Sequence, residues 1–478
     1  NTDITDDKVL SKGLSFLHQW LEKTFGKQIK LFDTEGLNKN LNIDSEIPPT
    51  KMENPLKIKN ENADIIIEYS IEEYNSLKLN IHGKIQVDGK DIQLDIKANF
   101  EHYFKADYYI ENGEKKKKDP NVDIYIILDP NNNFYGSFDN ELYKPLTNVG
   151  VKIIYVDLDH LNDPVWVYSP IWRVFIKPFG NKKNGGKIKN LIDPKAPKVT
   201  MRSILKALNL KANHRKVIMN EKTVFLPSAN PHKEGSRHSN IAFETNGEIM
   251  KDIFIGEQDV AKFSKSKISD HKLEIAPVIE GTYSVQYLTE GKIGKSVTNE
   301  IINADMGDEI LIAQFFLADR EVVKEIIKAA KRGVDFKIIL NNSQSSMGMG
   351  GIPNKTAADE VMTKTHKSLG FLTIRWYNNG EEQFHTKLMI VKKPTYMITF
   401  GGSGNFTRRN LRDYNLESEL KVISPYNTPF SNDVLNYFDR IWTNRDAVFT
   451  LNYDDAKRES NLNNLLYKFI EPSGFSAF

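Results

Sequence analysis

Residues 385–405 read HTKLMIVKKPTYMITFGGSGN, and residues 214–230 read HRKVIMNEKTVFLPSAN. Both stretches begin with His-x-Lys, continue through an apolar run, a polar turn and a second apolar run, and end in Ser-x-Asn. Short apolar runs on either side of a polar turn are typical of paired, partly buried strands. Because the same order of features occurs twice, we predict that the chain contains two copies of one structural unit.

The two copies place the same polar side chains at matched positions. These candidate site residues are His214, Lys216, Ser228 and Asn230 in the first copy, and His385, Lys387, Ser403 and Asn405 in the second. A glutamate follows each copy, Glu244 in one and Glu417 in the other. Side chains two apart on a strand point to the same face, so each histidine and lysine should face one way. A pseudo-two-fold axis would bring both sets into one cleft.

These residue types suit phosphodiester chemistry. A neutral imidazole can attack phosphorus, while a second imidazole protonates the leaving oxygen. Lysine and asparagine would supply charge and hydrogen-bond donors to the non-bridging oxygens. A carboxylate on the far nitrogen of each imidazole would fix its tautomer and raise its basicity, and Glu244 and Glu417 are the candidates.

A metal site is the alternative interpretation of His-x-Lys. Two histidines without cysteine or paired carboxylates make a poor zinc site. Cysteine is absent from the chain, which also excludes disulfides, iron–sulfur clusters and a cysteine nucleophile. We therefore expect neither a metal nor another cofactor.

The sequence around the copies predicts an α/β fold. Residues 320–332 carry apolar positions at helical spacing and are followed by Gly333, a typical helix-ending residue. Strand–helix–strand with short connections predicts a right-handed βαβ unit. The expected buried strands are continuous apolar runs at residues 123–129, 151–156, 309–316 and 334–340.

Residues 1–115 have a different pattern of apolar and polar residues. Residues 8–30 show helical spacing, and alternation over residues 60–112 around Asp88-Gly89 predicts an antiparallel meander. The run EKKKKD at 114–119 predicts a charged loop at a domain boundary. We predict an amino-terminal domain, two halves and a helical tail at residues 1–115, 120–275, 276–450 and 451–478.

Composition narrows the function classes. The chain has 478 residues and a formal net charge of +2, which argues against a binder of polyanions driven by basic tails. The sequence contains no apolar run long enough to span a bilayer as a helix. Because the chain begins at Asn1, we expect that a signal or anchor segment has been removed. We expect an extracytoplasmic or membrane-peripheral protein, with the cytoplasmic face not excluded.

The repeated residues resemble the signature of the phospholipase D superfamily, His-x-Lys-x4-Asp followed by Gly-Ser-x-Asn. The resemblance covers roughly residues 120–450, and the second half is similar to bacterial cardiolipin-synthase-like members. The stretches that carry it are GIPN (351–354), RWY (375–377), QFHTK (383–387) and NFTRRN (405–410). The chain departs from the signature where Glu221 and Lys392 stand for the aspartate and Pro227 for the glycine.

The resemblance implies an α/β (α+β) fold in which two halves, each with a seven-stranded mixed sheet flanked by helices, pack face to face. It also implies a two-step reaction through a phosphohistidine. We expect His214 to be the nucleophile and His385 the acid and base, and the sequence leaves the reverse assignment open. Glu417 would then orient His214, and Glu244 would orient His385. One chain supplies both histidines, so we expect a monomer to be competent.

Three functions remain open on this basis. The first is hydrolysis of phospholipids or transfer of their phosphatidyl groups, the second a metal-independent nuclease, and the third a non-catalytic membrane-binding homologue. The intact duplicate argues against the third, and the small net charge gives little support to a basic groove for nucleic acid. We expect Arg408, Arg409 and Arg412 to be structural partners rather than clamps on a nucleic-acid backbone.

An aromatic segment favours the lipid function. DPVWVYSPIWRVF at residues 163–175 is typical of loops at membrane interfaces, although ordinary core packing would give the same composition. SSMGMGGIPN at 345–354 would form a lid or a plain connector. The expected partners are therefore a phospholipid substrate and a membrane surface, with nucleic acid less favoured.

Overall fold

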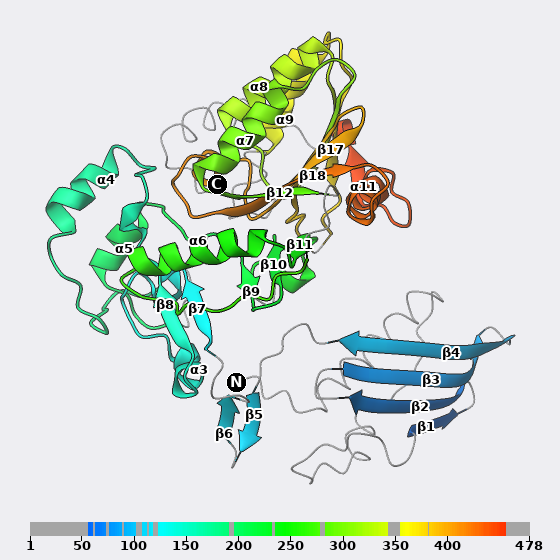
Figure 1. Cartoon of the computed structure of the whole chain (residues 1–478), viewed down its shortest axis with the longest axis horizontal. Coiled ribbons are helices and arrows are strands. Elements are labelled where there is room, and N and C mark those ends of the chain that lie inside the picture. Colours follow the sequence, from blue (N-terminus) through cyan, green and yellow to red (C-terminus); the bar gives the residue numbers. More distant parts are fainter. Residues whose placement is uncertain are drawn as a thin grey trace. The chain divides into compact units, whose positions relative to one another are not determined.

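The computed structural model describes the strands between Leu56 and Lys117 and most of the chain from residue 123 to residue 455. In the second part the described ranges are 123–190, 196–231, 235–277, 283–342, 354–380 and 382–455. The chain divides into two compact units, Asn1–Asp119 and Pro120–Phe478 (Figure 1). The helix expected at 8–30, most of the loop at 345–354 and most of the tail at 451–478 lie outside the described residues.

The first unit contains a four-stranded antiparallel meander, as predicted. Its strands follow one another in chain order: β1 (Leu56–Asn60), β2 (Ala63–Glu72), β3 (Ser76–Val87) and β4 (Lys90–Glu101). The prediction of a charged loop at 114–119 is wrong for most of this range, because Glu114–Lys117 forms β6 and pairs with β5 (Tyr108–Glu111). Backbone pairing satisfies the same hydrogen bonds whatever the side chains are, so a charged run next to a strand can still join it.

The second unit is built on an eight-stranded mixed sheet in the order β12-β18-β17-β16-β13-β14-β15-β19. β13, β14 and β15 are parallel to one another, and the remaining neighbours pair antiparallel. The bounds are β12 (Ser284–Thr289), β13 (Glu309–Gln314), β14 (Asp335–Asn341), β15 (Leu372–Tyr377), β16 (Lys387–Lys392), β17 (Tyr396–Gly402), β18 (Ser418–Pro425) and β19 (Thr450–Asn452).

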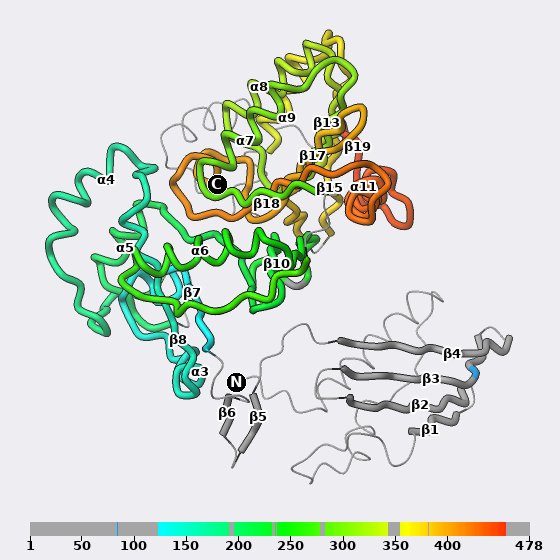
Figure 2. Tube along the Cα trace, in the orientation of Figure 1, coloured from blue at the N-terminus to red at the C-terminus, as the bar shows by residue number. Residues whose placement is uncertain are grey.

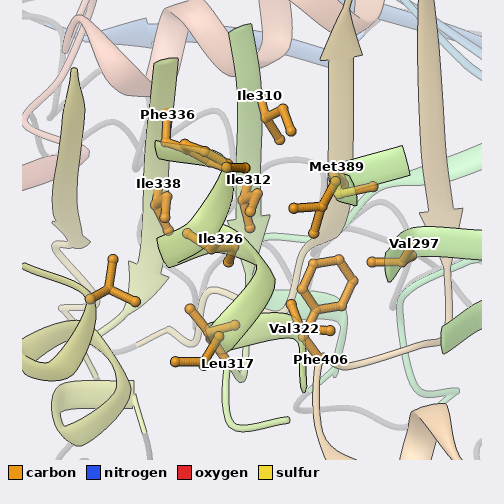
Figure 3. Close-up of a cluster of buried hydrophobic side chains, with 14 of the residues drawn as sticks. Val297, Ile310, Ile312, Leu317, Val322, Ile326, Phe336, Ile338, Met389 and Phe406 are labelled. Atoms are coloured by element: carbon orange, nitrogen blue, oxygen red, sulfur yellow. The ribbon is translucent and has the colours of Figure 1, made fainter. Parts of the chain in front are cut away.

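One face of this sheet is covered by α7 (Gly291–Ile302), α8 (Arg320–Arg332) and α9 (Asn354–Thr365). Figure 3 shows Ile312 and Ile338 on the strands among Val322 and Ile326 of α8. The predicted βαβ unit is confirmed, because β13 and β14 are parallel and α8 connects them.

Local sequence explains where α8 begins and ends. The Asp319 carboxylate accepts hydrogen bonds from the Glu321 and Val322 amides at the first turn. Gly333 ends the helix with φ 106°, a left-handed conformation that favours glycine.

The opposite face of the sheet packs against α11 (Pro429–Trp442) and against the first half of the unit, which is the predicted half at residues 120–275. Leu311 and Ala313 of β13 lie on this face, alternating with the residues that face α8. The first half contributes apolar side chains from α6 (Ile249–Phe263) and from β10 (Val224–Pro227). The two halves therefore share one hydrophobic core.

The first half has smaller sheets than the second. Figure 2 shows the trace of the first half in cyan to green. It has a parallel pair, β7 (Tyr125–Leu128) with β8 (Lys152–Tyr155), and an antiparallel sheet in the order β11-β10-β9. The remaining elements are β9 (Ile218–Met219), β11 (Ala242–Thr245), α3 (Lys144–Asn148), α4 (Tyr168–Ile171), a π-helical segment (Trp172–Ile176) and α5 (Met201–Ala207).

The expectation of matched seven-stranded sheets is therefore wrong. The first-half strands are two to four residues long and leave side chains such as Phe225 partly exposed, so they cannot enclose a second large core. The fold is nevertheless α/β, with a large mixed sheet flanked by helices. No helix in the described ranges has the length and apolar content needed to cross a membrane.

Candidate active site

His214 lies in the loop before β9 and is held by a carboxylate from the second half. Its Nδ1 is 2.8 Å from Glu417 Oε2, and Glu417 stands immediately before β18. The His214 amide donates to the Leu416 carbonyl at 2.8 Å, and the neighbouring Asn213 amide donates to Asp129 Oδ2 at 2.6 Å. Backbone hydrogen bonds to two other segments thus fix the imidazole in front of Glu417.

Glu417 is fully buried, and protein groups donate hydrogen bonds to both of its carboxylate oxygens. Ser403 Oγ donates to its Oε2, and Asn410 Nδ2 donates to its Oε1. Burial alone would raise its pKa, but the interactions with His214 and Lys216 and the hydrogen bond from Ser403 outweigh burial and lower it. An ionised carboxylate can only accept, so His214 Nδ1 carries the proton and Nε2 keeps a free lone pair.

His385 directly precedes β16 and is held in a matching way by the first half. Its Nδ1 is 3.1 Å from Asn240 Oδ1, and its amide donates to the Ser239 carbonyl at 2.9 Å. Asn240 Nδ2 donates to the carbonyls of Gly235 and His238, at 3.0 and 2.9 Å. Since both amide protons of Asn240 are engaged there, Oδ1 is the acceptor and His385 Nδ1 is the donor. Lys387 Nζ also lies 3.2 Å from this Nδ1, but it donates to the His385 carbonyl at the shorter distance of 2.9 Å.

The serines complete two matched chains of hydrogen bonds. Ser403 Oγ donates to Glu417, which holds His214, and Ser228 Oγ donates to Asn240 at 3.2 Å, which holds His385. In each chain the serine and the acceptor come from one half and the histidine from the other. Parallel backbone bridges, Asn213 with Leu416 and Ser239 with Phe384, join the halves next to each histidine. The repeat in the sequence therefore appears as a repeat in the geometry of the site.

The predicted pairing of Glu244 with His385 is wrong. Glu244 lies on β11 with an exposed side chain, and its Oε1 accepts a hydrogen bond from Thr223 Oγ1 at 3.1 Å. Asn240, just before β11, takes the position that Glu417 takes just before β18. The position of Asn240 just before an apolar run could have indicated it in the sequence. It was missed because only carboxylates were considered as partners of the histidines.

The two lysines donate to the backbone of their own histidines. Lys216 Nζ donates to the His214 carbonyl, and Lys387 Nζ to the His385 carbonyl, each at 2.9 Å. Both are buried. Burial lowers the pKa of Lys216 to about 8 and that of Lys387 well below its usual value. Phosphate bound beside them would favour their charged forms.

The two histidines and two lysines act on one another electrostatically. Burial lowers the pKa of His385 well below its usual value, and the charges of Lys387, Lys216 and His214 add to this effect. Burial also lowers the pKa of His214, with Lys387 contributing and Glu417 opposing. Both imidazoles are thus neutral near pH 7, and the four groups form one site.

The two asparagines of the Ser-x-Asn sequences follow the serines of the site. Asn405 is buried and its Oδ1 has no hydrogen-bond partner, while Asn230 is half-buried after β10. The structure thus brings together seven of the predicted residues, and the Ser-x-Asn order places the two asparagines next to them. The seven are His214, Lys216, Ser228, His385, Lys387, Ser403 and Glu417.

The site also contains residues that the sequence did not indicate. The His238 ring lies 6.2 Å from the His385 ring, and its Nδ1 accepts from the Gln383 amide, so its Nε2 carries the proton. Glu419 is buried, and burial together with Glu417 raises its pKa well above the usual value. Neither has a counterpart in the other copy of the repeat, which is why the pattern could not indicate them.

Among the described residues, no group of three or more His, Cys, Asp or Glu side chains is arranged to hold a metal ion.

Comparison with known proteins matches the second-half residues of this site to a family model. The family model described as "Cardiolipin synthase, PLD-like domain" matches residues 297–442, which include His385, Lys387, Ser403, Asn405 and Glu417. No curated protein matches the chain.

The solved structures that the chain resembles have low sequence identity to it. Nuc from Salmonella typhimurium, a phospholipase D family member, is 22% identical over 37% of this chain and 99% of its own, with a TM-score of 0.27. NucT from Helicobacter pylori is 15% identical over 36% and 99%, with a TM-score of 0.27. Phosphatidylserine synthase from Haemophilus influenzae is 12% identical over 73% and 88%, with a TM-score of 0.41. The family match identifies residues 297–442 as similar to a phospholipase D-like domain.

Proposed function

We propose that this chain is a phosphodiesterase or phosphatidyltransferase that acts on phospholipids through a phosphohistidine intermediate. The observation that carries the proposal is the pair of crossed contacts, His214 with Glu417 and His385 with Asn240. Each contact engages Nδ1 and leaves Nε2 available for chemistry. Two buried lysines beside the imidazoles supply positive charge for a phosphate group.

The difference between the two partners supports the assignment of roles. When His214 Nε2 bonds to phosphorus, the imidazole becomes cationic, and the Glu417 carboxylate stabilises that charge. The partner of His385 is a neutral amide, which lets His385 release a proton to the leaving alkoxide. In the free protein His385 is neutral, and the negative charge of the bound phosphodiester offsets the lysines that lower its pKa.

The proposed reaction has two steps. First, the P–N bond to His214 forms, the P–O bond to the leaving alcohol breaks, and His385 gives that alcohol its proton. Second, water or an acceptor alcohol gives a proton to His385 and attacks phosphorus, and the P–N bond breaks. One chain carries both histidines, so we propose that a monomer suffices.

A phospholipid substrate is favoured by two observations. The matching family model is that of a cardiolipin synthase domain. The arginines after the second Ser-x-Asn are engaged within the protein: Arg412 pairs with Asp319 at 2.7 Å, and Arg408 donates to Tyr414 Oη at 2.8 Å. A nuclease would need such groups for the nucleic-acid backbone. We accordingly propose that the chain works at a membrane surface, as an extracytoplasmic or peripheral protein.

A parallel assay tests the substrate class. The full chain is incubated with phosphatidylglycerol vesicles and, separately, with single-stranded DNA, each with and without EDTA. We expect products from the lipid alone and equal rates with EDTA. Cleavage of the DNA alone would replace this proposal with the nuclease, and loss of activity with EDTA would reject the metal-independent route.

A further inference from the structure

The helical segment formed by α4 and residues Trp172–Ile176 is fixed to the protein by one face only. Trp172 is buried on this face. Arg173 pairs with Asp163 at 2.9 Å, and Lys177 pairs with Asp159 at 3.0 Å. These contacts set the rotation of the segment about its axis, so the direction of its other face is determined.

The other face is apolar and exposed. It carries what we call the apolar patch: Trp166 (66% exposed), Val167 (50%), Ile171 (48%), Val174 (63%), Phe175 (68%) and Phe179 (71%). Val167, Ile171, Val174 and Phe175 recur at the spacing of one helix face. An ordinary surface helix has the reverse pattern, with its apolar stripe turned inward. Contiguous exposed apolar surface of this kind marks an interaction site.

Positive charge lies next to the apolar patch along the chain. Residues 164–190 contain no acidic residue and six basic ones, of which Arg173, Lys177 and Lys183 pair with aspartates. Lys182, Lys187 and Lys189 are exposed in the loop that follows Phe179, and Lys198 is exposed on the segment that pairs with this loop through the Ile188–Val199 bridge. The surface therefore combines an apolar centre with a basic border.

We infer that the apolar patch and its lysines dock the protein on an anionic phospholipid bilayer. Tryptophan and phenylalanine are suited to the interface between headgroups and acyl chains, and lysines are attracted to anionic headgroups. Figure 1 shows α4 at the outer edge of the second unit.

Two other occupants fit the surface less well. A second copy of the chain would bring one basic border against another, which repels. Single-stranded nucleic acid would use aromatic rings for stacking, but the centre of the helical stripe is aliphatic, with Val167, Ile171 and Val174. The inference deepens the proposed function, because docking would bring the lipid to the same molecule that carries the histidines.

Vesicle binding of the full chain tests the apolar part of the surface. The variant Val174→Ser/Phe175→Ser/Phe179→Ser changes exposed side chains only. Leu369→Ser/Phe371→Ser is the matched control, because these residues are 70% and 81% exposed elsewhere. On vesicles of phosphatidylglycerol and phosphatidylcholine, we expect the patch variant to sediment with at least tenfold weaker affinity and the control to match the unaltered chain.

Charge is tested separately with Lys182→Gln/Lys187→Gln/Lys189→Gln against the exposed set Lys324→Gln/Lys331→Gln/Lys367→Gln. The first set should weaken binding to the anionic vesicles severalfold, and the second should not. Pure phosphatidylcholine vesicles should bind the unaltered chain weakly and should not distinguish the two sets.

Three results would overturn the inference. They are equal vesicle binding by the patch variant and its control, a dimer of the unaltered chain that the patch variant disrupts, and tight binding of single-stranded DNA that only the patch variant loses. Turnover is measured apart, on monomeric short-chain phosphatidylglycerol, which the patch variant should hydrolyse or transfer normally. If the unaltered chain acts on no phospholipid yet binds vesicles through the patch, the proposed function fails and the docking surface stands.

Discussion

Asn240 holds His385 through its amide oxygen, 3.1 Å from Nδ1, at the position where the matched half of the site has a carboxylate, Glu417, 2.8 Å from His214 Nδ1. A site built from two copies of one pattern is therefore unequal at the atoms that control its proton transfers. The unequal partners favour different roles for the two histidines.

Glu417→Gln should lower kcat by about 10²–10⁴-fold while the protein stays folded. The substitution removes the charge that stabilises the phosphorylated imidazole and fixes its tautomer. Glu244→Gln is the matched control, because Glu244 is exposed and bonded to Thr223, and it should keep near-normal kcat. Equal losses in both variants, measured with a soluble phosphodiester, would reject the assignment of Glu417.

Asn240→Asp should move the alkaline limb of the kcat/KM profile to higher pH. In the unaltered chain, burial and the nearby lysines lower the pKa of His385, which favours its neutral form. A carboxylate at residue 240 favours the protonated form, so this pKa rises, by about 1–3 pH units for a carboxylate in contact. Asn240→Ala should lose activity without this displacement. An alkaline limb that stays in place in Asn240→Asp would show that His385 is not the acid.

Anion binding should weaken above pH 8. Burial lowers the pKa of Lys216 to about 8, so this ammonium loses its proton as the pH rises through that value. Sulfate keeps its charge over this range, and its affinity, measured as inhibition of turnover between pH 6.5 and 9.5, should fall by up to tenfold per pH unit.

Two lysine variants control this experiment. Lys216→Arg keeps its charge and should remove the fall in affinity. Lys222→Arg, on the exposed turn before β10, should leave the fall unchanged. A flat profile in the unaltered chain, or the same fall in Lys216→Arg, would contradict the role of Lys216 in binding the phosphate.

Local signals in the sequence predicted the elements around the site well. Asp319 and Gly333 bound α8 because capping needs only neighbouring atoms, and the apolar runs beside it form β13 and β14. The crossed contact between His214 and Glu417 followed from the repeat and the family resemblance. These features depend on short stretches of chain or on exact duplication.

The remaining features depend on tertiary context. An amide at Asn240 can accept a proton donor as a carboxylate does, so residue type alone did not identify it. The periodicity of residues 163–175 fits a helix facing either way, and only the anchoring of Trp172 and Arg173 shows that Phe175 faces outward. The small sheets of the first half differ from the expectation because duplication of the site did not require duplication of the strands around it.

Trapping the covalent intermediate tests the central claim most directly. His385→Ala is mixed with bis(para-nitrophenyl) phosphate, whose leaving group needs no protonation, and the protein is quenched and mapped by mass spectrometry. Without His385 to activate water, the account predicts a phosphoryl adduct that accumulates on the peptide containing His214 and is absent from the His214→Ala variant. An adduct on His385 in the His214→Ala variant, with none on His214 in His385→Ala, would contradict it.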